Sequence, residues 1–338
     1  MPTSFLQALL DNTPLDFMDG PLPDGSQGQM LGEGAWLVEP VRSPVMNLVI
    51  SCGIHGNETA PIELVGRLIE AIRTGILCPQ SRVLFVMGNL DAMRAGKRYL
   101  VEDINRLFCG KHGEVAMGAE PARAAALEQV LQQFFAGAEP HTPRWHFDLH
   151  TAIRGSYYEK FAIYPFVDGL PHDPQAVALL GACDIQTMLL HSKPSPTFSY
   201  HASHHFGAKA FTLELGKARP FGQNAGVDVS ALERVLAGMI AGVLPALPDY
   251  DPAAFRIFEA TRDVIKTSAQ FKLNLAPDVQ NFTPLEAGYV VAEDAGHRVV
   301  VQPGEHIIFP NPDVKVGLRA GILVAPAQLK TKSGANAC

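Results

Sequence analysis

Short apolar runs alternate with amphipathic helical patterns between residues 45 and 244, and this order constrains the fold more than any other feature of the chain. The run VMNLVISC at residues 45–52 is typical of a buried strand. From Glu58 to about Thr74, apolar residues recur at three- and four-residue steps, which predicts an amphipathic helix. The order then repeats, with strands predicted at 82–87, 144–150, 185–191 and 208–215 and helices at 122–135, 173–182 and 229–244. Strands that alternate with helices predict an α/β layered domain with a largely parallel sheet.

The two ends of the chain differ from this central part. Residues 1–43 are predicted to form short strands and turns. Near LPDYDP (247–252) the pattern changes, and from there on short β-type runs are separated by Gly, Pro and Asn, which predicts a smaller β-rich domain. We therefore expect an α/β domain, a β-rich domain and a flexible tail, at residues 1–247, 248–330 and 331–338.

The composition is that of a globular protein with a large core, because 47% of the 338 residues are apolar. The net charge of −7 argues against nucleic acid or an anionic membrane surface as the main partner. The N-terminus lacks a basic start, and no apolar run approaches the roughly 18 residues that span a bilayer, so we expect a cytoplasmic protein with no membrane partner. The sequence leaves the oligomeric state open, a homo-oligomer included.

The cysteines do not suggest a disulfide framework. They are odd in number and widely scattered, and no two of them form a CxxC pair, so a cysteine zinc knuckle is not indicated either. We expect free thiols at all five positions, Cys52, Cys78, Cys109, Cys183 and Cys338.

His55 and Glu58, in SCGIHGNETAPIEL (51–64), follow the carboxyl end of a predicted strand and start a predicted helix. Open α/β sheets usually bind their ligands at this place. At a spacing of three, an imidazole and a carboxylate share one face of a helical turn and can converge on one cation. Such a pair also arises by chance, so a metal site needs further support.

The run WHFDLH (145–150) provides that support. Period-two alternation places Trp145, Phe147 and Leu149 on one face of a strand, with His146, Asp148 and His150 on the other. His150, at the carboxyl end, is expected to reach the same sheet edge as His55. Two histidines and one glutamate with a vacant fourth position are a ligand set for catalytic zinc. His146 and Asp148 are interpreted as strand or outer residues, with Asp148 a candidate to orient a ligand. The alternative for His150 is a hydrogen-bonded core histidine.

Glu214, in FTLELGK (211–217), is a lone carboxylate in a hydrophobic predicted strand. A buried carboxylate without a partner is costly, so Glu214 either forms an ion pair or takes part in chemistry. If it faces the metal, it can take a proton from water and return it to a leaving amine. The alternative is a structural salt bridge to Lys217 or to an arginine.

The segment GKRYLVEDINRLF (96–108) has weak helical character and no obvious apolar stripe, and it carries Arg98, Asn105 and Arg106. Arginine side chains bind carboxylates through two parallel hydrogen bonds, so the segment is interpreted as a clamp for an acidic substrate. Arg154, which follows the second histidine, is a weaker candidate for the same role. The alternative is a solvated loop with incidental ion pairs. The run HASHH (201–205) has no carboxylate at ligand spacing, so it is interpreted as a polar turn or short helix and left out of the site.

Four ordered motifs resemble one family. HGNETAP, GNLDAMRAGKRYLVEDINRLF, DLHTAIRGS and TLELGKARPFGQN are similar to the succinylglutamate desuccinylase and aspartoacylase family of zinc-carboxypeptidase-like proteins. The match covers most of residues 45–225, and FPNPDVKVGLRAG near the C-terminus is similar too. The DLHTAIRGS and LELGKARPFGQN versions favour the succinylglutamate branch. No position with a chemical role departs from the pattern.

The resemblance implies a three-layer zinc-carboxypeptidase-like catalytic domain with a mixed, largely parallel sheet, and one Zn²⁺ per chain. It implies His55, Glu58 and His150 as metal ligands and Glu214 as the catalytic glutamate. Arg98, Asn105 and Arg106 match substrate-contacting positions. The implied reaction is hydrolysis of N-succinyl-L-glutamate to succinate and L-glutamate, in arginine catabolism by the succinyl route. The alternatives are the same chemistry on another N-acyl amino acid, a divalent ion other than zinc, and a metal-binding module without turnover.

Overall fold

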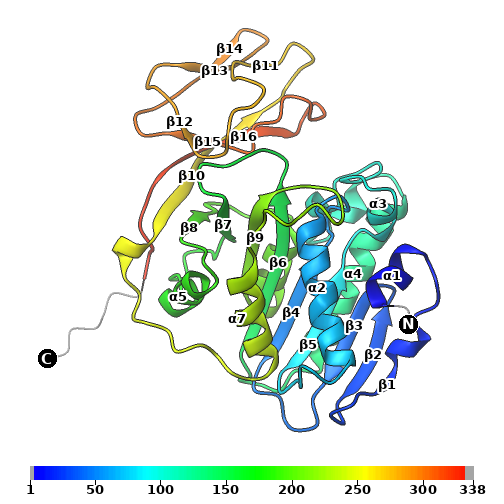
Figure 1. Cartoon of the computed structure of the whole chain (residues 1–338). Coiled ribbons are helices and arrows are strands. Elements are labelled where there is room, and N and C mark those ends of the chain that lie inside the picture. Colours follow the sequence, from blue (N-terminus) through cyan, green and yellow to red (C-terminus); the bar gives the residue numbers. More distant parts are fainter. Residues whose placement is uncertain (1–3, 332–338) are drawn as a thin grey trace, which may run out of the picture.

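The computed structural model describes residues 4–331, and its larger part is an α/β layered unit built on one sheet (Figure 1). The predicted flexible tail lies, from residue 332 on, outside the described residues. In the larger part the strands follow the order β1-β2-β3-β5-β4-β6-β9-β7-β8. They are β1 (Gly20–Pro21), β2 (Gln27–Gly32), β3 (Ala35–Glu39), β4 (Asn47–Cys52), β5 (Arg82–Met87), β6 (Arg144–Ala152), β7 (Lys160–Tyr164), β8 (Thr187–Leu190) and β9 (Lys209–Lys217).

The centre of this sheet is parallel. Strand β4 pairs in parallel with β5 and β6, and β6 with β9, so four neighbouring strands have their carboxyl ends at one edge. Strand β7 runs antiparallel to β9 but parallel to β8. The sheet is therefore mixed with a parallel centre, as predicted.

Helices cover both faces of the sheet. They are α1 (Phe5–Leu10), α2 (Thr59–Arg73), α3 (Leu90–Arg94), α4 (Ala119–Ala136), α5 (Pro174–Ala182), α6 (Phe198–Phe206) and α7 (Ser230–Ile240), with the 3-10 turns η1 (Asp16–Met18), η2 (Ile104–Arg106), η3 (Lys111–Glu114) and η4 (Pro252–Ala254). Helices α2, α5 and α7 pack through one apolar cluster, and α4 and α6 through a second cluster on the other face. This arrangement confirms the three layers that the sequence predicted.

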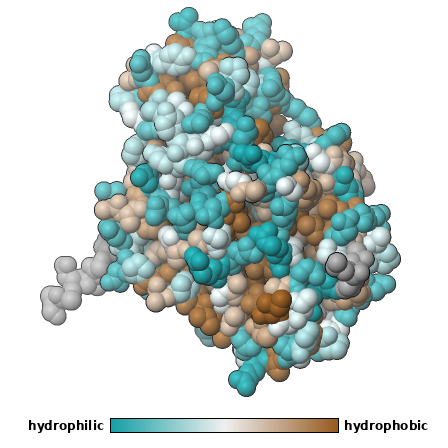
Figure 2. All heavy atoms as spheres, in the orientation of Figure 1, coloured by the Kyte–Doolittle hydropathy of each residue, from teal (hydrophilic) through white to brown (hydrophobic). Residues whose placement is uncertain are grey.

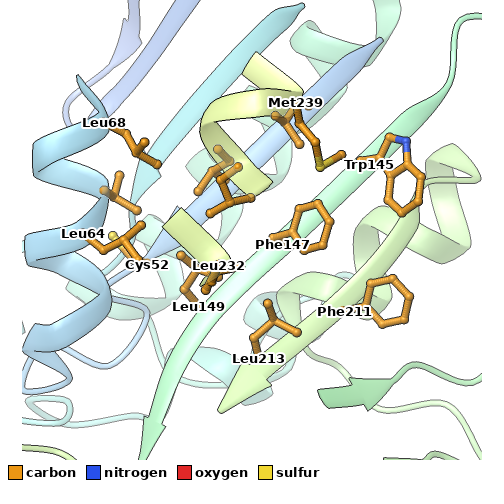
Figure 3. Close-up of a cluster of buried hydrophobic side chains, with 14 of the residues drawn as sticks. Cys52, Leu64, Leu68, Trp145, Phe147, Leu149, Phe211, Leu213, Leu232 and Met239 are labelled. Atoms are coloured by element: carbon orange, nitrogen blue, oxygen red, sulfur yellow. The ribbon is translucent and has the colours of Figure 1, made fainter. Parts of the chain in front are cut away.

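Helix α2 shows how the sequence pattern becomes packing. Its apolar residues at three- and four-residue steps are all buried, and the helix lies against the sheet beside α7 (Figures 1 and 3). In Figure 2 hydrophilic and hydrophobic residues are interspersed over the face of the molecule that these helices present. Within residues 4–331, no helix is long and apolar enough to cross a membrane.

The smaller part is β-rich, as predicted, and one long strand joins it to the larger sheet. Strand β10 (Arg256–Ile265) pairs in parallel with β8 through its first residues and antiparallel with β16 (Arg319–Pro326) along most of its length. Strands β15 (His306–Ile308) and β12 (Thr283–Pro284) continue that sheet, and a separate sheet contains β11 (Lys272–Leu273), β13 (Val290–Asp294) and β14 (His297–Val300).

The prediction for residues 1–43 is only partly right. The segment contains β1, β2 and β3, but it begins with helix α1, which the sequence analysis missed. Ser4 caps this helix by accepting a hydrogen bond from the backbone N–H of Gln7 at 3.1 Å, and Phe5, Ala8 and Leu9 are buried. A six-residue helix is marginal by itself, so packing against the neighbouring helices stabilises it rather than a long periodic pattern.

Candidate metal centre and active site

The predicted site residues meet at the carboxyl edge of the parallel strands. His55 follows β4 after a tight loop, His150 lies near the end of β6, and Glu214 lies opposite His150 in the register of β6 and β9. The loop needs glycine at residue 56, because a Cβ atom there would lie 2.2 Å from the backbone of Ala92. The close approach of the loop to α3 therefore fixes the position of His55 after the end of β4.

Strand β6 separates the core from the site, as its alternation predicted. Figure 3 shows Trp145, Phe147 and Leu149 in the apolar cluster that also contains residues of α2 and α7. His150 and Asp148 lie on the other face, where both are buried and hydrogen-bonded. The apolar face therefore anchors the strand that presents the polar residues.

Three side chains converge on one point. The Nδ1 atoms of His55 and His150 are 3.2 Å apart. Nδ1 of His55 is 2.9 Å from Oε1 of Glu58, and Nδ1 of His150 is 2.9 Å from Oε2 of Glu58. All three residues are buried, although they come from two segments more than ninety residues apart. The structure thus brings together the three residues that were predicted as metal ligands.

The other ring nitrogen of each histidine is held by a carboxylate. Nε2 of His55 lies 3.0 Å from Oδ1 of Asp103, and Nε2 of His150 lies 3.0 Å from Oδ2 of Asp148. Each carboxylate accepts the proton of Nε2, so in the neutral imidazole the lone pair of Nδ1 points toward Glu58. Ser51 in turn donates to Asp148 at 2.6 Å. Asp148 was predicted to orient a ligand, but Asp103 was missed.

This arrangement fits a cation. Burial lowers the pKa of His150, but the carboxylates of Asp148 and Glu58 outweigh it and raise the pKa well above its usual value, so the group favours a positive charge at its centre. When both imidazoles are neutral and protonated at Nε2, two nitrogen lone pairs and one carboxylate face one another there at about hydrogen-bond distance. Such a set of electron-pair donors is unfavourable alone and favourable around a positive ion. Two imidazoles, one carboxylate and paired outer carboxylates are the donor set of catalytic zinc sites. The ligand atoms of the three residues lie within 4.8 Å of one another, close enough for one ion to contact all of them.

Glu58 occupies the position before α2 but does not cap the helix with its side chain. Its carboxylate instead accepts hydrogen bonds from Arg98 Nη1 at 2.6 Å and from the backbone N–H of Thr151 at 3.0 Å. Burial raises the pKa of Glu58, but the charges of His55 and His150 outweigh this effect and hold the pKa well below its usual value. Glu58 is therefore an ionised carboxylate fixed in place by three other residues and the backbone.

Glu214 has the opposite electrostatic environment. It is 7% exposed, and within residues 4–331 its Oε2 atom has no hydrogen-bond partner. Burial and the negative charge of Glu58 raise its pKa to about 7, although His150 and Arg98 act in the other direction. A carboxyl group with a pKa near neutrality can both accept and donate a proton, which is the property of a general base and acid. Among the described residues Glu214 forms no ion pair with Lys217 or with an arginine, and Arg98 pairs with Glu58 instead.

The predicted substrate residues lie around this centre in different settings. Arg98 is bonded to Glu58, so its remaining N–H groups are the ones left for a ligand. Asn105 is buried, and its side-chain oxygen accepts from the backbone N–H of Phe198 at 3.0 Å. Arg106 Nη1 donates to the carbonyl of Asn105 at 2.8 Å. Arg154 lies farther out, where it donates to the carbonyl of Pro277 in the β-rich part.

The segment around these residues is more ordered than its sequence suggested. Ile104, Leu107 and Phe108 are buried, so the segment does have an apolar side, which packs against α4 and α6. Burial raises the pKa of Asp103, but the charges of His55 and Arg106 outweigh it and lower the pKa well below its usual value. The turn at residues 103–106 thus carries both Asp103, the partner of His55, and Arg106, the arginine predicted to bind the substrate.

Known proteins share this architecture. Residues 44–239 match the Succinylglutamate desuccinylase/Aspartoacylase catalytic domain, and residues 253–327 match the AstE/AspA barrel-sandwich hybrid domain. The chain belongs to the succinylglutamate desuccinylase and aspartoacylase family. The hybrid domain corresponds to the β-rich part, so the predicted fold class is confirmed in both parts of the chain.

Individual members of the family are similar over nearly their whole length. A protein of Pseudomonas fluorescens (strain SBW25) named succinylglutamate desuccinylase is 50% identical over 307 residues, which are 90% of each chain. The crystal structure of the succinylglutamate desuccinylase of Chromobacterium violaceum is 44% identical, covers 97% of this chain and 99% of its own, and has a TM-score of 0.85. That of Vibrio cholerae is 32% identical, with a TM-score of 0.88 over 96% of this chain and 95% of its own.

Proposed function

We propose that the chain is a metal-dependent amide hydrolase that cleaves N-succinyl-L-glutamate to succinate and L-glutamate, a step of arginine breakdown by the succinyl route. The observation that carries this proposal is the 50% identity, over nine-tenths of both chains, to a protein named succinylglutamate desuccinylase. The buried Glu214 beside the His55, Glu58 and His150 group supports turnover rather than metal binding alone.

His55 and His150, through their Nδ1 atoms, and Glu58, through its carboxylate, would hold one Zn²⁺ per chain. A zinc ion with such ligands polarises an amide carbonyl and lowers the pKa of water toward neutrality. Asp103 and Asp148 keep both imidazoles in the tautomer that binds an ion, because each accepts the proton of Nε2. Thr151 and Arg98 hold the carboxylate of Glu58 against rotation.

Glu214 would move the proton. It takes a proton from the water that attacks the succinyl carbonyl carbon, and a new C–O bond forms. When the C–N bond breaks, Glu214 returns that proton to the nitrogen of the departing glutamate, so the reaction yields a carboxylate and an amine. A pKa of about 7 suits both halves of the cycle, because the group is neither too weak as a base nor too weak as an acid.

The substrate carries three carboxylates around one amide, and the arginines near the site provide complementary charge. Arg106 uses one N–H on the carbonyl of Asn105 and keeps the others for an acidic group. Arg98 is hydrogen-bonded to Glu58, and its charge lowers the pKa of Glu214, so it would lie near the scissile bond of a bound substrate. Asn105 fixes the turn that carries Arg106, and Arg154 would contribute at the boundary with the β-rich part.

Steady-state kinetics of the zinc-loaded chain on N-succinylglutamate, N-acetylaspartate and a peptide with a free C-terminus tests the substrate. We expect the highest kcat/KM on N-succinylglutamate, because it presents the largest number of carboxylates to the arginines. A higher kcat/KM on N-acetylaspartate would assign the chain to the aspartoacylase branch instead. No hydrolysis of any of the three by a zinc-loaded, folded chain would contradict the proposal.

A further inference from the structure

We propose that Cys109, His201 and His205 form a second metal site, for a borderline divalent transition-metal ion such as Zn²⁺. One ligand atom from each of these residues lies within 4.8 Å of the others. They share no residue with the His55, Glu58 and His150 group. The inference does not depend on the proposed function, because it concerns ligands on the side of α6 and the turn that follows η2.

The two histidines stand one turn apart on α6. Residues at positions i and i+4 of a helix lie on the same face, and this spacing is used by helical metal sites. The imidazole rings of His201 and His205 are 4.6 Å apart between centroids. His201 is buried and His205 is exposed, so the pair runs from the interior to the surface. These histidines were left out of the predicted site because the run HASHH has no carboxylate at ligand spacing.

The third ligand comes from a segment ninety residues earlier. Cys109 follows η2 with a left-handed backbone (φ 59°), and Gly110 continues in the same conformation (φ 78°). This conformation is unfavourable for cysteine and persists only where surrounding contacts hold it. The neighbouring residue Phe108 is buried, and its ring packs on that of Phe198 in α6 at 4.6 Å between centroids. The fold therefore brings the thiol of Cys109 to the histidine face of α6.

The donor set selects the ion. A thiolate with two imidazoles suits Zn²⁺ and similar borderline ions, whereas Mg²⁺ and Ca²⁺ prefer oxygen ligands. His201 also shows an unmet need for a partner, because it is 6% exposed and its Nδ1 has no hydrogen-bond partner among the described residues. Oε1 of Glu128 lies 3.6 Å from that Nδ1, an ion-pair distance that is too long for a hydrogen bond. Three protein ligands leave a fourth position for water or for Glu128.

An ion at this place would act as a clip between two segments. Cys109 lies three residues after Arg106, and α6 already contacts this segment, because the backbone N–H of Phe198 donates to the side-chain oxygen of Asn105. Binding of an ion to both segments would hold the turn with Asn105 and Arg106 against α6. The ion would therefore stabilise the folded chain, since the unfolded chain does not keep the three ligands together.

Titration of the full-length chain with Co²⁺ tests the site through absorbance. A cysteine thiolate bound to Co²⁺ gives a charge-transfer band in the near ultraviolet, and the first group, with only nitrogen and oxygen ligands, cannot give one. We expect the wild-type chain to bind two Co²⁺ ions and to show this band. Cys109→Ser is expected to lose the band and one equivalent of Co²⁺, and His205→Ala to bind that ion at least about tenfold more weakly.

Matched variants separate the site from other thiols and histidines. Cys78→Ser and Cys338→Ser control for other thiols, and His204→Ala controls for a second exposed histidine of α6 that is outside the group. All three are expected to keep the band. Because His205 is exposed, His205→Ala tests the site without disturbing the core. A wild-type chain without the band, or a band that survives in Cys109→Ser, would overturn the proposal, and neither result would bear on hydrolysis at Glu214.

Discussion

Two buried glutamates, one in each part of the chain, show how the same residue type serves different purposes. Glu305 in the β-rich part is 3% exposed, and Arg262 donates to both of its oxygens, at 3.1 and 2.6 Å. It also accepts from Thr261 at 2.9 Å and from the backbone N–H of Gln302 at 2.7 Å. Glu214 at the sheet edge is 7% exposed and leaves one oxygen without any partner in the described residues.

The difference appears in the pKa values. Burial raises the pKa of Glu305, but the hydrogen bonds from Arg262 and its neighbours outweigh burial and lower the pKa. At Glu214 burial prevails and the pKa rises to about 7. A buried carboxylate with a full set of donors stabilises a fold, whereas one held near neutrality without them is available for proton transfer. Hydrogen-bond partners therefore distinguish a structural glutamate from a candidate catalytic one better than burial does.

Glu214→Gln should have the largest effect. Glutamine keeps the shape of the side chain but cannot accept a proton, so kcat is expected to fall about 10²- to 10⁴-fold with the metal content unchanged. Removal of a charge that lacks a partner should leave the unfolding free energy unchanged or raise it. Initial rates, metal analysis and denaturant unfolding measure the three quantities. A variant with wild-type kcat would show that Glu214 has no catalytic role.

Arg106→Ala should reduce kcat/KM on N-succinylglutamate by about 10- to 100-fold, the value of one charge-assisted hydrogen-bonding group. An uncharged acyl amide should lose much less, because it has no carboxylate for Arg106 to bind. The matched control is Arg298→Ala, since Arg298 lies on β14 and is mostly exposed in its pair with Glu293. Equal losses on the charged and uncharged substrates would show that Arg106 positions the turn rather than the substrate.

Glu305→Gln should reverse the pattern of Glu214→Gln. The substitution weakens the bonds to Arg262 and leaves donors unpaired, so the unfolding free energy is expected to fall by about 1–3 kcal/mol. Per folded molecule, kcat should stay at the wild-type value, because Glu305 is not among the site residues. Urea unfolding followed by circular dichroism gives the first quantity and rates at low temperature the second. A large loss of kcat in a fully folded variant would contradict a purely structural role for Glu305.

The penalty of Glu305→Gln should itself depend on pH. Because folding lowers the pKa of Glu305 below the ordinary 4.5, the carboxylate contributes stability above that pH. The contribution is lost as pH falls through the lower pKa of the folded state. The difference in unfolding free energy between wild type and variant is therefore expected to be constant above pH 4.5 and to shrink below it. A difference that grows as pH falls would mean that folding raises the pKa of Glu305, as proposed for Glu214, and does not lower it.

Much of the fold and the grouping of the three candidate metal ligands could be predicted because the signals are local. The periodicity of α2 and the alternation in β6 report which residues are buried, and they place His55, Glu58 and His150 at one sheet edge. Helix α1 was missed because six residues are too few for a periodic signal. The boundaries of the domains stay predictions, and so do the roles of the metal ligands, of Glu214 and of the substrate residues.

Contacts between distant segments carry no local signal. Asp103 was not recognised as the partner of His55, because its segment shows no clear periodicity and its role depends on a fold that joins residues 48 positions apart. For the same reason Cys109 was not connected with His201 and His205. Periodicity reports burial, but it does not report which distant side chain a polar group will meet.

Anomalous diffraction at the zinc edge, from crystals of the zinc-loaded chain, tests the central claim most directly. We predict a peak about 2.0–2.1 Å from Nδ1 of both His55 and His150 and at a similar distance from the carboxylate of Glu58. The same crystals would show whether Cys109, His201 and His205 bind a second ion. If a preparation that hydrolyses N-succinylglutamate shows no peak between His55, Glu58 and His150, the assignment of the metal centre is wrong.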